Sequence, residues 1–430
     1  MIAGLPMKQV DPRVIDHPVE RRGFVTVPLD HAAPGGPTID IFYRLIPSRG
    51  SAHADDPERP IIVVINGGPG IPSSFYRPLD YDYERQRMPR GGLDRFAHLL
   101  TTHRVLIADQ RGTDGCSAPL DTDDPSLDAN LVARLFSSDS HALDYLAVVD
   151  RVIPEGEPYW VIAQSYGGLP GMQLIARADR RQPRGIVFSS SALPFEDPLE
   201  SMRHRRREQL KLNLHLCDVV PDIASRLAAV RARCADLGVD PTIVHGLYAL
   251  LGKDVPGVWE RDIVKRLDKM ATQTRDEIMA DVEAGLELPS LLNYILSSCN
   301  FSPGWTDRTM AALGSREIPF EPWMIDEHEM LMQTGQDGSW RQAMVDAIDR
   351  APPPATPMPT LEELRAALAR GQALFTAADN DAMVPGDSYR DTVLRFLVEG
   401  HTQVKTLPGG HHAIFLEAGH EALLAWAAGI

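Results

Sequence analysis

Short apolar runs separated by stretches with helical periodicity recur along most of the chain. Two of them, 61–65 (IIVVI) and 105–108 (VLIA), are continuous and rich in β-branched residues, which is typical of strands buried on both faces. Runs alternating with helical stretches predict a mostly parallel sheet covered by helices on both faces. We expect eight strands, at 23–28, 39–45, 61–65, 105–108, 159–163, 185–188, 372–376 and 403–407.

The two ends of this pattern differ from its centre. A connector rich in proline and glycine, 30–38 (DHAAPGGPT), joins the first two runs and favours an antiparallel hairpin at one sheet edge. Between 193 and 354 the strand pattern disappears and helical periodicity takes over, until a proline-rich stretch and a capping box at Thr360–Glu363 begin a new helix. The pattern predicts an α/β core at 1–192 and 355–430, with a helical cap domain at 193–354 inserted after the sixth strand.

Composition and charge exclude several classes of protein. The 430 residues are 43% hydrophobic and 24% charged, as in ordinary globular proteins. With 43 basic and 59 acidic residues the net charge is −16, the wrong sign for neutralising phosphates, so no nucleic-acid partner is expected. No window approaches 18 apolar residues, and the first residues lack the apolar stretch of a signal peptide. We therefore expect a soluble, cytoplasmic protein with no membrane partner.

Cysteine spacing and the basic residues add little chemistry. The four cysteines (Cys116, Cys217, Cys234 and Cys299) are far apart and form no CxxC pair, which indicates reduced thiols and no metal site. The basic run 203–207 (RHRRR) is interpreted as a solvated helix face without a binding role.

A serine lies where a predicted strand turns into a predicted helix. Ala163–Gly168 (AQSYGG) has small residues two positions before and two positions after Ser165. Such residues let the chain turn sharply and hold the serine hydroxyl clear of the sheet. We predict Ser165 as a nucleophile, which excludes the epoxide hydrolases and haloalkane dehalogenases, because both need an aspartate here.

An acid and a base are expected after the insertion, since they follow the serine in this kind of chain. Asp379 and Asp381 both follow the seventh predicted strand, and His411 and His412 follow the eighth. In related hydrolases a proline four residues before the histidine and an acid five residues after it are frequent. Both spacings select His412 as the general base, with His411 as the alternative.

A glycine-rich loop follows the third predicted strand. Asn66–Gly70 (NGGPG) offers backbone N–H groups that can stabilise a developing oxyanion, and we predict Gly68 and the residue after the nucleophile, Tyr166, as the oxyanion hole. Nucleotide binding is not expected, because the chain has no GxxxxGK[ST] motif and no GxGxxG after a strand.

Taken in order, NGGPG, DQRGTDGCS (109–117), AQSYGG, DAMVP (381–385) and the paired histidines resemble the proline iminopeptidase (prolyl aminopeptidase) family. The resemblance implies an α/β-hydrolase fold, Asp381 as the triad acid and Ser165 as the nucleophile. It also implies release of an N-terminal proline or similar residue through an acyl-enzyme, with a small-molecule or short-peptide substrate and without a metal or organic cofactor. The oligomeric state stays open.

Family aminopeptidases hold the free amine of the substrate with cap carboxylates, and these are incomplete here. Glu317, Glu321 and Trp323 are the expected substrate-binding residues, but 296–300 (LSSCN) has no acid where the second carboxylate is expected. Asp326, Glu327 and Glu329 are candidate substitutes. The missing acid keeps open an esterase, lactonase or amidase acting on a non-peptide small molecule, and a third hypothesis is a non-catalytic binding protein.

Overall fold

The computed structural model describes residues 17–51, 59–82, 94–113, 128–178, 181–196, 198–285, 318, 320–321, 323–326 and 358–430. Within them the chain forms an eight-stranded sheet, and every predicted strand is confirmed to within two residues at each end. The strands are β1 (Arg21–Pro28), β2 (Thr38–Ile46), β3 (Ile61–Ile65), β4 (Arg104–Ala108), β5 (Tyr159–Gln164), β6 (Gly185–Ser189), β7 (Ala373–Ala378) and β8 (Thr402–Leu407).

The order of the strands across the sheet is β1-β2-β4-β3-β5-β6-β7-β8. The first two strands form the predicted antiparallel hairpin, β2 also pairs antiparallel with β4, and all later neighbours are parallel. This is the strand order of the α/β-hydrolase fold, as predicted. It places the carboxyl ends of β3, β5, β6, β7 and β8 along one edge of the sheet, where ligands bind in open α/β sheets.

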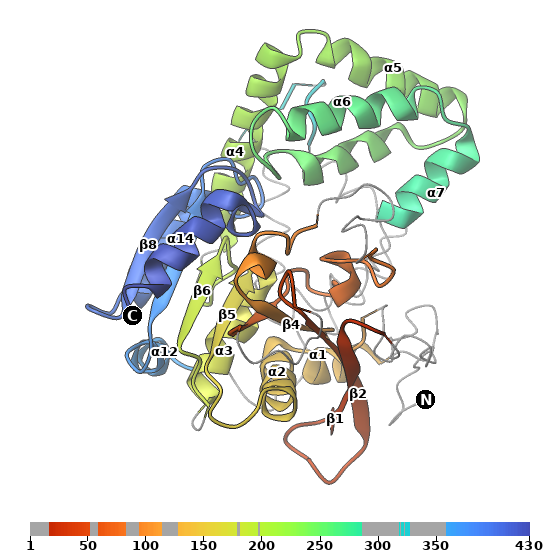
Figure 1. Cartoon of the computed structure of the whole chain (residues 1–430). Coiled ribbons are helices and arrows are strands. Elements are labelled where there is room, and N and C mark those ends of the chain that lie inside the picture. The colour runs from red at the N-terminus through yellow and green to blue at the C-terminus, as the bar shows by residue number, and fades with distance from the viewer. Residues whose placement is uncertain are drawn as a thin grey trace.

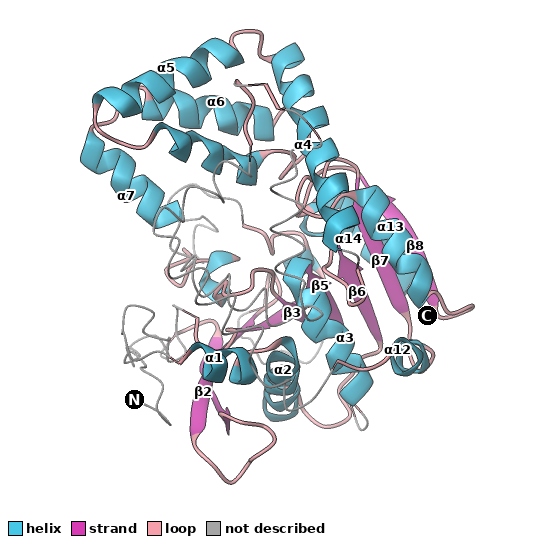
Figure 2. Ribbon diagram, turned by 180° about the vertical axis from the view of Figure 1, so that it is seen from behind, coloured by secondary structure: helices cyan, strands magenta, loops and turns pink. Residues whose placement is uncertain are grey.

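Helices cover both faces of the sheet (Figures 1 and 2). One apolar layer joins the sheet to five helices, which are α1 (Ala129–Leu135), α2 (Ser138–Val152), α3 (Gly168–Arg177), α12 (Leu361–Leu368) and α13 (Gly386–Val393). The other layer contains α14 (Glu417–Ala427) and the 3-10 turn Leu99–Thr101. Because β3 to β7 are buried on both faces, their runs are continuously apolar instead of alternating.

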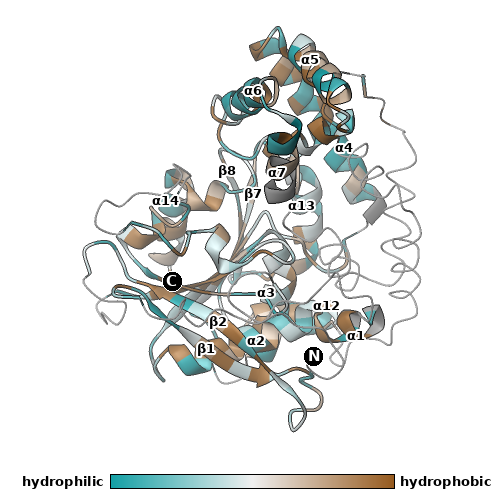
Figure 3. Ribbon diagram, turned by 90° about the vertical axis from the view of Figure 1, so that its right-hand side faces the viewer, coloured by the Kyte–Doolittle hydropathy of each residue, from teal (hydrophilic) through white to brown (hydrophobic). Residues whose placement is uncertain are grey.

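A group of helices follows β6 and lies beyond the carboxyl edge of the sheet (Figure 1). It contains α4 (Pro198–Val219), α5 (Ile223–Asp236), the 3-10 helix Pro241–Leu250, α6 (Trp259–Met270) and α7 (Arg275–Gly285). These helices bury an apolar cluster of their own, in which Trp259 is a packing residue, and α5 and α6 carry both hydrophobic and hydrophilic residues (Figure 3). The cluster also includes Ala382, next to Asp381. Most of the rest of the predicted insertion lies outside the described residues.

Helix α4 corrects one prediction. The run 203–207 was expected to be solvated, but Arg206 is buried and pairs with Asp326, with 3.1 Å between Nη1 and Oδ1. Arg206 lies on the same helix face as Gln209 and Asn213, which are both buried. The Asn213 side-chain amide donates to the Ile325 carbonyl oxygen and accepts the Ile325 N–H. This face therefore packs against 324–326, and its arginine is used to neutralise a carboxylate.

Two smaller predictions can be compared directly. The capping box is present, because Thr360 and Glu363 each accept the backbone N–H of the other. Cys217 and Cys234 are free thiols, whereas Cys116 and Cys299 lie outside the described residues. None of the described helices is long and apolar enough to cross a bilayer.

Candidate active site

Ser165 occupies a strained turn at the carboxyl end of β5. Its φ is 55°, a left-handed conformation that serine rarely adopts, and the side chain is partly exposed. The backbone N–H of Ala192 donates to the Ser165 carbonyl over 2.8 Å, and the 3-10 turn Ser165–Gly167 runs directly into α3. The surrounding chain therefore holds the serine at the start of a helix, as the strand–turn–helix pattern predicts.

The small residues of this turn are required by close contacts. A Cβ on Gly167 would come within 2.3 Å of the Ile65 carbonyl oxygen, and one on Gly168 within 2.4 Å of the Ala192 carbonyl oxygen. Ala163 fits because α3 presents a glycine opposite it, and a Cβ at Gly171 would lie 2.7 Å from that of Ala163. The missing methyl group at Gly171 makes room for the alanine.

A buried aspartate and a buried histidine form a hydrogen-bonded pair beside this turn. Oδ2 of Asp381, on the loop after β7, lies 2.9 Å from Nδ1 of His411, on the loop after β8. Oδ1 of Asp381 accepts the backbone N–H groups of Met383 (2.8 Å) and Val384 (2.9 Å), which fixes the carboxylate. The competing acid, Asp379, is exposed.

The pair connects to the serine through Gln164, the residue before it. The Gln164 side-chain amide donates to the His411 carbonyl oxygen over 3.2 Å. Ser165, Asp381 and His411 therefore lie on loops at the carboxyl ends of β5, β7 and β8.

The spacing selects His412, but the histidine that pairs with Asp381 is its neighbour, His411. His412, the predicted base, does not hold Asp381; its Nε2 instead accepts from Nη1 of Arg95 over 2.7 Å. Burial lowers the pKa of His412 well below its usual value, and the nearby charges of Arg95, His411 and Lys253 lower it further. The prediction of a His412–Asp381 pair is corrected to His411–Asp381, since of two adjacent residues only one faces the carboxylate.

The predicted glycine loop lies against the serine. A Cβ on Gly67 would be 3.0 Å from Cβ and 3.5 Å from Oγ of Ser165, so only a glycine allows this approach. The Gly67 N–H donates to the Tyr76 hydroxyl (2.7 Å), which donates in turn to Gln164 Oε1 (3.1 Å). Gly68 follows with φ of 123°, and no acceptor for its N–H is found in the described part of the chain.

The second motif, Asp109–Gln110–Arg111, anchors that loop. Gln110 accepts the Gly70 N–H (2.7 Å) and donates to the carbonyls of Gly67 (2.9 Å) and Asn66 (3.1 Å). Arg111 is fully buried and binds Asp144 of α2 through two nitrogens, at 2.6 and 2.7 Å. The motif therefore ties the glycine loop to the sheet and to the helix layer behind it.

Tyr166, the residue after the nucleophile, is held through its ring. Its hydroxyl lies 2.7 Å from Nδ1 of His141 on α2. Burial lowers the pKa of His141 to about 3, so this histidine is neutral at physiological pH.

Of the expected cap residues, the structure describes Glu321, Trp323 and Asp326. Glu317, Glu327 and Glu329 lie outside the described residues, Glu321 is exposed and Trp323 is partly buried. Asp326 is buried, but it is paired with Arg206.

Two basic residues that sequence reasoning missed lie near the paired histidines. Arg95 contacts His412 and stacks over the Phe75 ring at 4.3 Å. Burial lowers the pKa of Lys253 to about 8, helped by the charge of Arg95. A single arginine and a single lysine outside any motif give no sequence signal, so only the fold reveals them.

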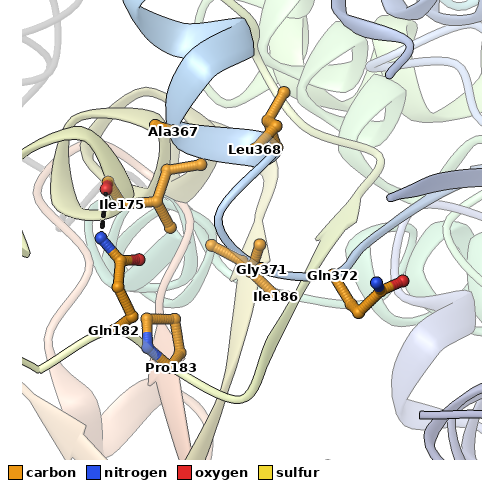
Figure 4. Close-up of a pocket in the computed structure, with 8 residues that line it drawn as sticks. All are labelled: Ile175, Gln182, Pro183, Ile186, Ala367, Leu368, Gly371 and Gln372. Atoms are coloured by element: carbon orange, nitrogen blue, oxygen red, sulfur yellow. Dashed lines mark hydrogen bonds between the residues drawn. The ribbon is translucent and has the colours of Figure 1, made fainter. Parts of the chain in front are cut away.

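A surface pocket elsewhere is unrelated to this site. It lies at the amino ends of β6 and β7 and is lined by residues such as Gln182, Ile186 and Leu368 (Figure 4). Ser165 lies at the opposite end of the strands. Among the described residues no group of three His, Cys, Asp or Glu side chains is arranged to hold a metal ion.

Comparisons with known proteins find one similar sequence segment and several similar solved structures. No protein-family model matches the chain. A 160-residue segment is 30% identical to the proline iminopeptidase AneH of Aspergillus aculeatus, spanning 35% of this chain and about a third (32%) of that protein. Similar solved structures include a thermophilic esterase from Thermogutta terrifontis (12% identity, 95% and 98% coverage, TM-score 0.44) and the enol-lactonase from Burkholderia xenovorans LB400 (15%, 91% and 97%, 0.42). At these scores the fold assignment rests on strand order.

Proposed function

We propose that the protein is a serine hydrolase that works through an acyl-enzyme. The observation that carries the proposal is the strained Ser165 turn, whose preceding residue contacts His411, itself hydrogen-bonded to the buried Asp381. A serine hydroxyl is a poor nucleophile without an adjacent base, and a histidine oriented by a carboxylate is the usual base.

The paired histidine has the tautomer that this role requires. With Asp381 accepting from Nδ1, the proton of neutral His411 resides on Nδ1 and Nε2 is free to accept a proton. In the proposed reaction Nε2 takes the Ser165 proton while Oγ attacks the substrate carbonyl carbon. The oxyanion forms near the N–H groups of Gly68 and Tyr166, the leaving group departs with the proton from His411, and water then hydrolyses the acyl-enzyme by the same steps.

The first candidate substrate is a peptide with an N-terminal proline or a similar residue. It is supported by the ordered motifs of the resemblance and by the 30% identity of a segment to a proline iminopeptidase. In this case Glu317 or Glu321 and Trp323 would contact the N-terminal residue.

The second candidate is a non-peptide ester, lactone or amide, and one observation favours it. Asp326, the buried substitute for an amine-binding acid, is neutralised by Arg206 at 3.1 Å. A buried ammonium needs an unpaired carboxylate, which this pair does not provide.

The two candidates separate in one assay. Proline coumarylamide, its N-acetyl derivative and short-chain nitrophenyl esters are compared, with Ser165→Ala as the blank. Cleavage of the free-amine substrate alone indicates an aminopeptidase, whereas turnover of esters or of the blocked amide alone indicates the second candidate. If none of these substrates is cleaved and a fluorophosphonate probe does not label Ser165, the hydrolase proposal fails and a binding protein is indicated.

A further inference from the structure

Two partly buried cations, Arg95 and Lys253, lie near the paired histidines. Nη1 of Arg95 is 2.7 Å from Nε2 of His412, whose ring centroid is 5.3 Å from that of His411. Lys253 lies on the loop after the 3-10 helix Pro241–Leu250, and this loop packs tightly on the histidine loop. A Cβ on Gly410 would come within 1.6 Å of the Gly252 carbonyl oxygen, so the backbones of the two loops are in contact at this point.

Neither cation has a carboxylate partner among the described residues. No carboxylate oxygen there lies within 4 Å of Arg95 or Lys253. Asp254 acts on both charges and Asp262 on Lys253, but only from beyond that distance, and Oδ1 of Asp254 accepts the Val255 N–H. Removing a charge from water without a partner is costly, so two partly buried cations that raise each other's energy favour an anionic partner.

The imidazole of His412, which Arg95 contacts, gives a second, independent observation. Since Arg95 donates to Nε2 of His412, the proton of the neutral ring is on Nδ1. That Nδ1 is buried and has no hydrogen-bond partner in the part of the chain that the structure describes. It is a buried donor without an acceptor, beside two cations that also only donate.

We propose that Arg95 and Lys253, with the Nδ1 donor of His412, bind a carboxylate that the substrate carries outside its scissile bond. The inference rests on the proposed function, because it places this carboxylate beside the bond that Ser165 attacks. It assigns the substrate class as carboxylate-bearing acyl compounds. The carboxylate has two chemical sources: the far end of a dicarboxylic acyl group, or the C-terminus of a dipeptide leaving group.

The experiment compares matched substrates that differ in one charge. The mono-nitrophenyl ester of glutaric acid is paired with the same ester whose second carboxylate is methylated, and the dipeptide Pro-Gly is paired with prolylglycinamide. Charge-assisted hydrogen bonds predict a kcat/KM preference of about 10- to 100-fold for the charged member of one pair. The ester pair places the carboxylate on the acyl side and the dipeptide pair places it on the leaving group.

Variants then test the assignment to these residues. Arg95→Met and Lys253→Met should each reduce the charge preference about tenfold, whereas Lys211→Met, which removes an exposed lysine of α4, should leave the preference unchanged. Reading the ratio of the two substrates within each variant removes differences in folded fraction. If Arg95→Met does not fold, Lys253→Met alone decides.

The outcomes separate this inference from the proposed function. Serine-dependent hydrolysis without any charge preference, or a preference that survives both variants, overturns the carboxylate site and leaves the hydrolase intact. If Ser165→Ala retains full activity, the proposed function fails, and calorimetric titration of glutarate into the wild-type protein and both variants decides on the site. Binding that the variants abolish supports the site, and absence of binding overturns it.

Discussion

Two adjacent histidines have opposite surroundings, and this difference is directly testable. His411 faces the carboxylate of Asp381, whereas His412 faces the guanidinium of Arg95. We expect His411→Ala to lower kcat/KM on a nitrophenyl ester by about 10⁴-fold or more, as for loss of a triad member. His412→Ala should cost only on the order of tenfold. A larger loss in His412→Ala than in His411→Ala would return the base to His412.

Gly167 offers a prediction about stability. A methyl group there would lie 2.3 Å from the Ile65 carbonyl oxygen, so Gly167→Ala must displace either β3 or the nucleophile turn. We expect a loss of about 3 kcal/mol or more in urea unfolding, together with loss of activity. The control is Gly35→Ala, where nothing lies within 4 Å of the new methyl group. Equal stabilities of the two variants would contradict the tight turn.

Lys253 predicts how the charge preference depends on pH. Its pKa is lowered to about 8 by burial and by Arg95, against Asp254 and Asp262, so it loses its charge as the pH rises through 8. The preference for a carboxylate substrate should therefore fall between pH 7 and pH 9. Lys253→Arg keeps the cation over this range and should make the profile flat. If the pH profiles of the wild-type protein and Lys253→Arg are parallel, Lys253 is excluded from the carboxylate site.

At the scale of elements, the sheet was predictable and the polar face of α4 was not. Short, continuous, β-branched runs such as Ile61–Ile65 are typical of strands buried on both faces, so the local sequence locates them. Arg206 belongs to a run that local sequence makes polar, and its burial depends on Asp326, 120 residues later. A distant ion pair of this kind leaves no mark in the local pattern.

The position of the glycine loop 66–70 depends on one side chain, Gln110, on the loop after β4. Gln110 satisfies three buried backbone groups, on Asn66, Gly67 and Gly70. Gln110→Ala leaves them without partners, which costs about 1–3 kcal/mol each, and lets the loop beside Ser165 shift. We expect kcat/KM to fall about 100-fold. Gln182→Ala, which removes one hydrogen bond at the far end of the sheet, is the control. An unchanged kcat/KM in Gln110→Ala would exclude this anchoring role.

At the scale of the whole molecule, the candidate site is formed by segments that lie far apart in the sequence. Ser165 and Asp381 were predictable because each follows a strand within a motif, and strand order then brings the loops together. The choice between His411 and His412 depends on which side chain faces Asp381. The residue spacing seen in related hydrolases carries no information about that direction. Arg95 and His412 are 317 residues apart, and their contact follows only from the packing of their two loops on the same face of the sheet.

Histidines buried in the fold predict that acid destabilises the whole protein. Burial lowers the pKa of His103 to about 4 and of His141 to about 3, below the 6.5 expected for the unfolded chain. Below pH 6.5 the unfolded state therefore binds more protons than the native state. As the pH decreases, the free energy of unfolding falls by up to about 1.4 kcal/mol per pH unit for each histidine. Glu20, with its pKa lowered to about 2 mainly by Arg44 against the effect of burial, adds a further loss below pH 4.5.

Thermal unfolding between pH 8 and pH 4 measures this effect. The Tm should be nearly constant above pH 7 and should fall by about 5 °C or more by pH 5, before most carboxylates titrate. His103→Gln removes one titrating group and should make the fall shallower without changing its onset. His204→Gln is the matched control, because His204 lies on α4 in the polar run 203–207 and is only partly buried. A profile that stays flat to pH 5, or that His103→Gln and His204→Gln change equally, would show that the buried histidines do not control acid stability.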